Sequence, residues 1–167
     1  MLVIGIDPGI ATTGYGLVRD SADALEVVDF GVIETPAGQP LHNRLLLLHD
    51  QLKKILLLHK PDSGAVEKLF FQRNVRTAMA VGQARGVALL ALAEASLDVA
   101  EYTPLEVKQA VVGYGAAEKS QVQQMVCALL GMESIPQPDD AADALAIAIC
   151  HLHSARFTSL ANAADTG

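Results

Sequence analysis

Hydrophobic and polar positions along the chain predict strands first and helices later. Residues 2–7 form an apolar run rich in β-branched side chains that ends at Pro8-Gly9, and the runs 15–19 and 25–33 follow after turn-forming stretches. These patterns indicate three β-strands. The strands follow one another so closely that they must be antiparallel neighbours, because a parallel return needs a crossover of about a dozen residues or more.

Helical and strand patterns alternate after this point. Apolar residues keep a helical period over 41–59, which predicts an amphipathic helix. Strands are expected at 64–67 and 99–102, and the long helix expected at 75–95 between them makes these two strands parallel. Three further helices are expected at 105–112, at about 118–130 and at 140 to about 153.

The predicted architecture is therefore α/β, with a five-stranded mixed sheet of three antiparallel and then two parallel strands, and helices on both faces. The chain has 167 residues, 51% hydrophobic and 19% charged, which is enough for one core. We expect one domain over residues 1–154 and a flexible tail over 155–167. No apolar run approaches the roughly 18 residues of a membrane span, and none resembles a signal peptide, so a cytoplasmic protein is expected.

Charge adds a second observation. The net charge of −7 argues against a protein that coats nucleic acid. The charges are segregated, however, because residues 68–85 carry four bases and no acid: Lys68, Arg73, Arg76 and Arg85. This segment is either a solvated helix face or a phosphate-contacting patch, and charge alone favours the solvated face.

Acidic residues stand at three predicted element ends. Asp7 ends the first strand, Glu67 ends the fourth, and three aspartates crowd the start of the last helix, at Asp139, Asp140 and Asp143. These acids can converge if the first and fourth strands are neighbours. Converging carboxylates repel one another unless a cation neutralises them, and oxygen ligands select Mg²⁺ or Mn²⁺. Two such ions about 4 Å apart suit phosphodiester hydrolysis, so the pattern indicates a metal-dependent nuclease.

Structural explanations compete with this hypothesis. Aspartates at a helix start are preferred caps, and an Asp before Pro-Gly often initiates a turn. Glu67 is harder to explain in this way, because it lies in a strand expected to be buried on both faces, where Glu is disfavoured.

Aromatic and basic side chains follow shortly after Glu67. One of Phe70 and Phe71 can belong to the core, and the other can stack on an exposed base, a contact worth about 1–3 kcal/mol. Arg73 and Arg76 would then hold phosphates.

Two lysines further along the chain are also candidates for phosphate contacts. Lys119 opens a predicted helix, where its charge opposes the helix dipole, and this unfavourable placement hints at a bound phosphate. Lys108 is a second candidate. For either lysine alone, solvent exposure is the commoner explanation.

Five segments carry a resemblance to a known family. They are GIDPGIATTGYG at residues 5–16, AVEKLFFQRN at 65–74, GQARGVALLA at 82–91, VKQAVVGYGAAEKSQVQ at 107–123 and DDAADALAIAICHLH at 139–153. Together, over residues 1 to about 154, they resemble the RuvC family of bacterial Holliday junction resolvases. Any one segment is weak evidence, since Asp-x-Gly after a strand also occurs in sugar kinases and actin-like ATPases, but five in order are specific.

The resemblance implies a ribonuclease H-like fold and a structure-selective endonuclease. Such a crossover junction endodeoxyribonuclease resolves four-way (Holliday) DNA junctions in homologous recombination and DNA repair. It would act as a homodimer that makes paired, symmetric nicks on opposing strands and leaves 5′-phosphate and 3′-hydroxyl ends. The implied cofactor is Mg²⁺, two ions per site, with Mn²⁺ also expected to support activity, and the implied partners are junction DNA and the RuvA/RuvB branch-migration complex.

The resemblance also implies roles for particular residues. The catalytic, metal-binding acids would be Asp7, Glu67, Asp140 and Asp143. Lys119 and Lys108 are expected near the scissile phosphate, and Phe70 is expected to enter the junction centre, with Arg73 and Arg76 as further DNA contacts. Counting back from Asp143 assigns the family's acid to Asp140, so that Asp139 would be an accessory residue.

Three alternatives remain. A sugar-kinase-like or actin-like phosphotransferase would use the turn after Asp7 on ATP, but those proteins need two such domains. An RNA-processing nuclease of the YqgF type would share the fold and size. A binding-only junction protein would keep the DNA-contacting patch without the chemistry, and the four intact acids count against it.

Overall fold

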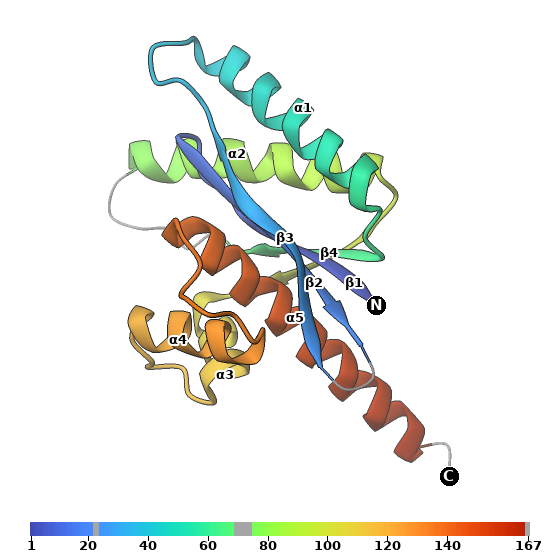
Figure 1. Ribbon diagram of the computed structural model, residues 1–167. Helices are drawn as coiled ribbons and strands as arrows, with labels where there is room; N and C mark the ends of the chain where they lie inside the picture. Colours follow the sequence, from blue (N-terminus) through green and yellow to red (C-terminus); the bar gives the residue numbers. More distant parts are fainter. Residues whose placement is uncertain (22–23, 69–74, 166–167) are drawn as a thin grey trace.

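The computed structural model describes residues 1–21, 24–68 and 75–165. Its strands are β1 (Leu2–Asp7), β2 (Thr12–Asp20), β3 (Leu25–Glu34), β4 (Ser63–Glu67) and β5 (Asp98–Tyr102). Its helices are α1 (Leu41–His59), α2 (Val75–Glu94), α3 (Pro104–Val112), α4 (Lys119–Leu129) and α5 (Asp139–Asp165). Figure 1 shows their arrangement. The predicted DNA contacts Phe70 and Arg73 lie outside the described residues.

The five strands form one mixed sheet in the order β3-β2-β1-β4-β5. β2 runs antiparallel to both β1 and β3, whereas β4 runs parallel to both β1 and β5. The predicted arrangement of three antiparallel and then two parallel strands is therefore confirmed. Because β1 and β4 are neighbours, the condition for Asp7 and Glu67 to lie at one edge of the sheet is met.

Side chains of the central strands alternate between two cores, one on each face of the sheet. Ile4, Ile6 and Val66 belong to the core that α1 and α2 cover. Val3 and Ala65 belong to the core on the opposite face, which α3, α4 and α5 cover. Figure 1 shows the two groups of helices on either side of the strands. The prediction of helices on both faces is also confirmed.

Two element boundaries differ by more than one residue from the sequence pattern. β2 begins at Thr12 rather than at residue 15, because its pairing with β3 continues to the partner of Thr12, Glu34. α5 continues to Asp165 rather than ending near residue 153. Arg156 holds this extension against the sheet, since its Nε donates to Asp20 Oδ2 at 2.6 Å. Flexibility of residues 155–167 stays a prediction.

The length of α5 does not make it a membrane helix. It has 27 residues. Neither α5 nor any other helix within the described residues combines the length and apolar character needed to cross a bilayer.

Candidate active site

Two acidic side chains lie at the ends of neighbouring parallel strands. Asp7 is the last residue of β1 and Glu67 the last of β4, and the residues before them, Ile6 and Val66, are register partners. Ile6 and Val66 point into the core under α1 and α2. Since side chains alternate along a strand, Asp7 and Glu67 both point to the face that α5 covers.

Glycines in β1 and β2 let the start of α5 approach the sheet closely. Gly14 is the register partner of Asp7, and a Cβ at Gly14 would lie only 1.9 Å from the carbonyl oxygen of Asp140. A Cβ at Gly5 would lie 2.2 Å from another backbone carbonyl oxygen of α5. Any side chain at either position would push the helix away. The two glycines therefore bring Asp140 beside Asp7, with Asp143 less than one helical turn further on.

Burial and mutual repulsion raise the pKa of three of these carboxyl groups. The pKa of Asp7 rises from 3.8 to about 7, first because of burial and then because of the charges of Glu67, Asp143 and Asp140. Burial and the charge of Asp143 raise the pKa of Glu67. Burial also raises the pKa of Asp143. The four acids are therefore close enough to act as one electrostatic cluster.

Lys119, the first residue of α4, reaches this cluster. Its Nζ lies 2.9 Å from Asp143 Oδ2 and 3.3 Å from Asp139 Oδ2. Burial alone would lower the pKa of Lys119, but its hydrogen bonds to the two aspartates and their charges raise it, so the ammonium form is favoured.

The sequence did not indicate how Asp139 would be held. Gln123 donates from Nε2 to Asp139 Oδ1 at 3.0 Å. This hydrogen bond, followed by the interaction with Lys119, lowers the pKa of Asp139. Gln123 lies one helical turn after Lys119, and that spacing is the signal that could have identified the contact. Asp139 thus belongs to the surroundings of Lys119 rather than to the buried acids.

An open groove of about 240 Å³ lies beside the acid cluster. Its charged lining consists of Glu67, Asp143, Lys108 and Lys119, and apolar side chains of α3, α4 and α5 line the rest. The groove therefore presents carboxylates and ammonium groups to a single ligand. This mixture suits a phosphate group accompanied by cations.

Other predicted contacts do not lie in this groove. Arg76 is exposed near the start of α2 and is not among the groove residues. Arg85, one of the four bases in segment 68–85, is only 18% exposed and forms an ion pair with Glu101. That pairing removes Arg85 from any phosphate-contacting patch.

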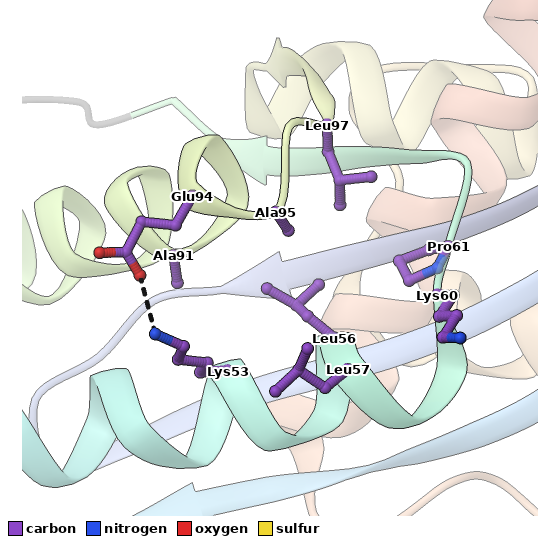
Figure 2. A pocket seen from close by; sticks show the side chains of 9 residues that line it. All are labelled: Lys53, Leu56, Leu57, Lys60, Pro61, Ala91, Glu94, Ala95 and Leu97. Atoms are coloured by element: carbon purple, nitrogen blue, oxygen red, sulfur yellow. Dashed lines mark ion pairs between the residues drawn. The ribbon is translucent and has the colours of Figure 1, made fainter.

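A second hollow, of about 250 Å³, lies between α1 and α2 on the other face of the sheet. Figure 2 shows its largely apolar lining, which includes Leu56, Leu57 and Leu97. Its one acidic lining residue, Glu94, is paired with Lys53 at 3.8 Å, as the dashed line marks. This hollow therefore lacks the clustered acids that distinguish the groove.

The donor chemistry of the acid cluster fits a hard divalent cation. Four carboxylates supply only oxygen donors, and a cation would relieve the repulsion that raises the pKa of Asp7. In the part of the chain that the structure describes, no three acidic, histidine or cysteine side chains already have the spacing of a metal site.

Comparison with known sequences identifies the family. The family described as "Crossover junction endodeoxyribonuclease RuvC" matches residues 3–151, a range that contains the four acids and Lys119. The chain belongs to the RuvC family. A RuvC protein from Syntrophomonas wolfei subsp. wolfei is 54% identical over 166 residues, which cover 99% of this chain and 96% of that protein.

Solved RuvC structures share the fold. Thermus thermophilus RuvC matches with a TM-score of 0.87 and 38% identity, over 95% of this chain and 97% of that chain. T. thermophilus RuvC in complex with a Holliday junction substrate matches with a TM-score of 0.87 and 36% identity, over 94% of this chain and 96% of that chain. The predicted ribonuclease H-like fold is confirmed, and membership of the RuvC family makes the chain a metal-dependent endonuclease.

Proposed function

We propose that this protein resolves four-way (Holliday) DNA junctions in homologous recombination and DNA repair. The observation that carries the proposal is the buried acid cluster beside Lys119, at the edge of a groove with both acidic and basic lining. The likeness to T. thermophilus RuvC in complex with a Holliday junction substrate supports this choice of substrate. The proposed protein partner is the RuvA/RuvB branch-migration complex. The cytoplasm is the proposed place of action.

The proposed cofactor is Mg²⁺, with two ions per site and Mn²⁺ as a substitute. Asp7, Glu67, Asp140 and Asp143 would hold the ions, because hard cations prefer carboxylate oxygens. Such ions lower the pKa of water and neutralise negative charge on a phosphodiester. The task of the protein is to hold the acids on two strand ends and one helix start, so that the phosphate meets them in a fixed orientation.

Proton binding at Asp7 competes with ion binding. With a pKa of about 7, the Asp7 carboxyl group keeps its proton through much of the acidic range. Cation binding requires the carboxylate and therefore displaces that proton. At Mg²⁺ concentrations too low to saturate the site, we expect cleavage to rise with pH through about 7 for this reason.

Basic and aromatic side chains are the proposed DNA contacts. Lys119 keeps its ammonium charge because the two aspartates raise its pKa, and Lys108 shares the same groove, so both are proposed to bind the scissile phosphate or its neighbours. Arg73 and Arg76 are proposed phosphate contacts, and Phe70 is proposed to stack on bases at the junction centre.

The proposed active form is a homodimer, which can make paired nicks because it matches the two-fold symmetry of a four-way junction. An exposed apolar stripe on α2 supports this form: Val75, Met79 and Leu90 are 71%, 61% and 54% exposed and share one helix face. Gly86 lies on the same stripe, and a Cβ there would meet nothing within 4 Å, which leaves room for a second copy. Contiguous exposed apolar surface is typical of an interface.

A cleavage assay with three substrates tests the proposed function. The protein is incubated with a mobile synthetic four-way junction, a matched linear duplex and a structured RNA, each with Mg²⁺, with Mn²⁺ and with chelator. We expect symmetric, metal-dependent nicks with 5′-phosphate and 3′-hydroxyl ends on the junction alone. Asp7→Asn should abolish them, whereas Asp98→Asn, which removes an exposed acid at the opposite end of β5, should not.

Two outcomes would replace the proposal with one of the alternatives. Junction binding without nicks in either metal would leave a recognition protein. Cleavage of the RNA but not of the junction would assign an RNA-processing nuclease.

A further inference from the structure

Arg85 connects helix α2 to the carboxyl ends of two strands. Its Nε donates a hydrogen bond to the backbone carbonyl oxygen of Glu67 at 3.1 Å. Its Nη2 pairs with the carboxylate of Glu101 in β5. The Arg85 side chain is only 18% exposed, and its bond to the Glu67 carbonyl is partly buried, whereas the ion pair with Glu101, whose side chain is 40% exposed, lies at the surface. The guanidinium group thus binds the last residue of β4 and the next-to-last residue of β5 at the same time.

Neither neighbouring strand supplies a backbone N–H group to the carbonyl oxygen of Glu67. On the β5 side, the ladder ends with the Lys68 N–H, which donates to the carbonyl oxygen of Tyr102 at 2.7 Å. On the β1 side, the chain continues past Asp7 into Pro8, which has no backbone N–H to donate. Unpaired carbonyl groups in a partly buried position are unfavourable, and Arg85 supplies the missing donor.

We propose that Arg85 is a positioning residue that fixes the backbone of Glu67 and thereby sets where the Glu67 carboxylate lies. This inference rests on the proposed function of Glu67 as one of the metal-binding acids. Arg85 acts through Glu67 and contacts neither the metal ions nor the phosphate, because its guanidinium group is already engaged by the Glu67 carbonyl and by Glu101.

The two contacts make different demands on the side chain. The ion pair with Glu101 needs a positive charge, whereas the bond to the Glu67 carbonyl needs a donor at the position of Nε. Lysine keeps the charge but carries all its donors on one terminal nitrogen, so it cannot make both contacts in the geometry of arginine. A lysine variant therefore separates the positioning role from a role of charge alone.

The test compares Arg85→Gln and Arg85→Lys with Glu101→Gln as the matched control. Glu101→Gln removes the ion pair and leaves the bond to Glu67 in place. Three quantities are measured for each protein: the single-turnover cleavage rate on a synthetic four-way junction, the Kd for that junction in chelator, and the Mg²⁺ concentration that gives half-maximal stabilisation against heat. Wild type and Glu67→Gln are run alongside.

Misplacement of a ligating group by about 1 Å can slow a reaction about 100-fold, so we expect both Arg85 variants to cleave about 10- to 100-fold more slowly. Their junction Kd should stay within about two-fold of wild type, and their Mg²⁺ midpoint should rise. Glu101→Gln should stay within about three-fold of wild type in cleavage rate, as expected for a partly exposed ion pair.

Several results would overturn the inference. A wild-type cleavage rate and Mg²⁺ midpoint in Arg85→Lys would show that charge alone matters. A rise in Kd that accounts for the slower cleavage would make Arg85 a DNA contact. If Arg85→Gln does not fold, the lysine variant and Glu101→Gln decide. If wild type itself fails to cleave the junction, the proposed function fails, and an unchanged Mg²⁺ midpoint in both Arg85 variants would still refute the positioning role.

Discussion

Replacing Asp7 by asparagine is expected to stabilise the metal-free protein at pH 8 while it abolishes cleavage. The folded protein raises the pKa of Asp7 from 3.8 to about 7, so folding disfavours the charged form. Below about pH 4 the carboxyl group is protonated in both the folded and the unfolded state, and the raised pKa has no effect on stability. As pH rises from about 4 to about 7, the unfolded state is increasingly favoured, because only there is the carboxylate hydrated and far from the other acids; above about pH 7 the loss of stability is complete. Asparagine carries no charge and removes this pH-dependent loss of stability.

The magnitude follows from the size of the pKa change. At about 1.36 kcal/mol for each pH unit, a rise from 3.8 to about 7 sets a ceiling of about 4 kcal/mol on the destabilisation above pH 7. Side-chain rotation and entering water relieve part of this repulsion, so we expect a gain of about 2 kcal/mol for Asp7→Asn. For a chain of this length, that gain raises the Tm by roughly 4 to 8 °C.

Urea and thermal denaturation in chelator, at pH 5 and at pH 8, measure this effect at one fixed protein concentration. The advantage of Asp7→Asn over wild type should be smaller at pH 5, where only part of the loss has developed, than at pH 8, where it is complete. Excess Mg²⁺ should reduce the advantage, because it binds the folded wild type more tightly than the variant. Asp98→Asn changes the net charge equally and should show no such pH dependence. An Asp7→Asn protein that is equally or less stable than wild type at pH 8 would refute the reasoning.

Three further predictions concern packing, the assignment of the acids and assembly. Gly14→Ala should abolish cleavage and destabilise the fold by about 1–3 kcal/mol, because its Cβ would lie 1.9 Å from the Asp140 carbonyl oxygen. Gly38→Ala, where nothing lies within 4 Å, should change neither property in the same denaturation and cleavage assays. In single-turnover assays, Asp140→Asn should not cleave the junction. Asp139→Asn removes only an exposed ion pair, so its cleavage rate should fall by no more than about five-fold. An inactive Asp139→Asn variant together with an active Asp140→Asn variant would reverse the assignment. Leu90→Asp should give a monomer in analytical ultracentrifugation, and a variant that stays dimeric would exclude the stripe on α2 as the interface.

The positions of Asp7 and Glu67 at the ends of two predicted strands indicated that their side chains could lie close together. Both residues close apolar strands, and the two strands had only to be neighbours for their carboxyl ends to meet. The spacing of Asp140 and Asp143, three residues apart, likewise predicts that both lie on one face of a helix. Local pattern therefore indicated which acids could meet, whereas the strand order on which their meeting depends is seen only in the structure.

The contacts of Arg85 could not be predicted in this way. Arg85 lies 18 residues after Glu67 and 16 residues before Glu101, and the sequence gives no signal for either pairing. Both contacts depend on how deeply α2 packs against the sheet, which is a property of the whole fold. In the sequence, Arg85 is one of four bases in segment 68–85, and nothing in the sequence indicates that it pairs with Glu101.

Local charge at the groove explains how a protein with a net charge of −7 can recognise a polyanion. Without cations, the carboxylates of the acid cluster oppose the attraction of Lys108 and Lys119 for phosphate. Divalent ions at the acids would reverse this balance, so that the same surface attracts the DNA backbone. Each ligand then favours binding of the other, because linkage between two sites is reciprocal. With the proposed ions at these acids, metal binding and junction binding would be one coupled equilibrium, which the net charge of the whole chain does not describe.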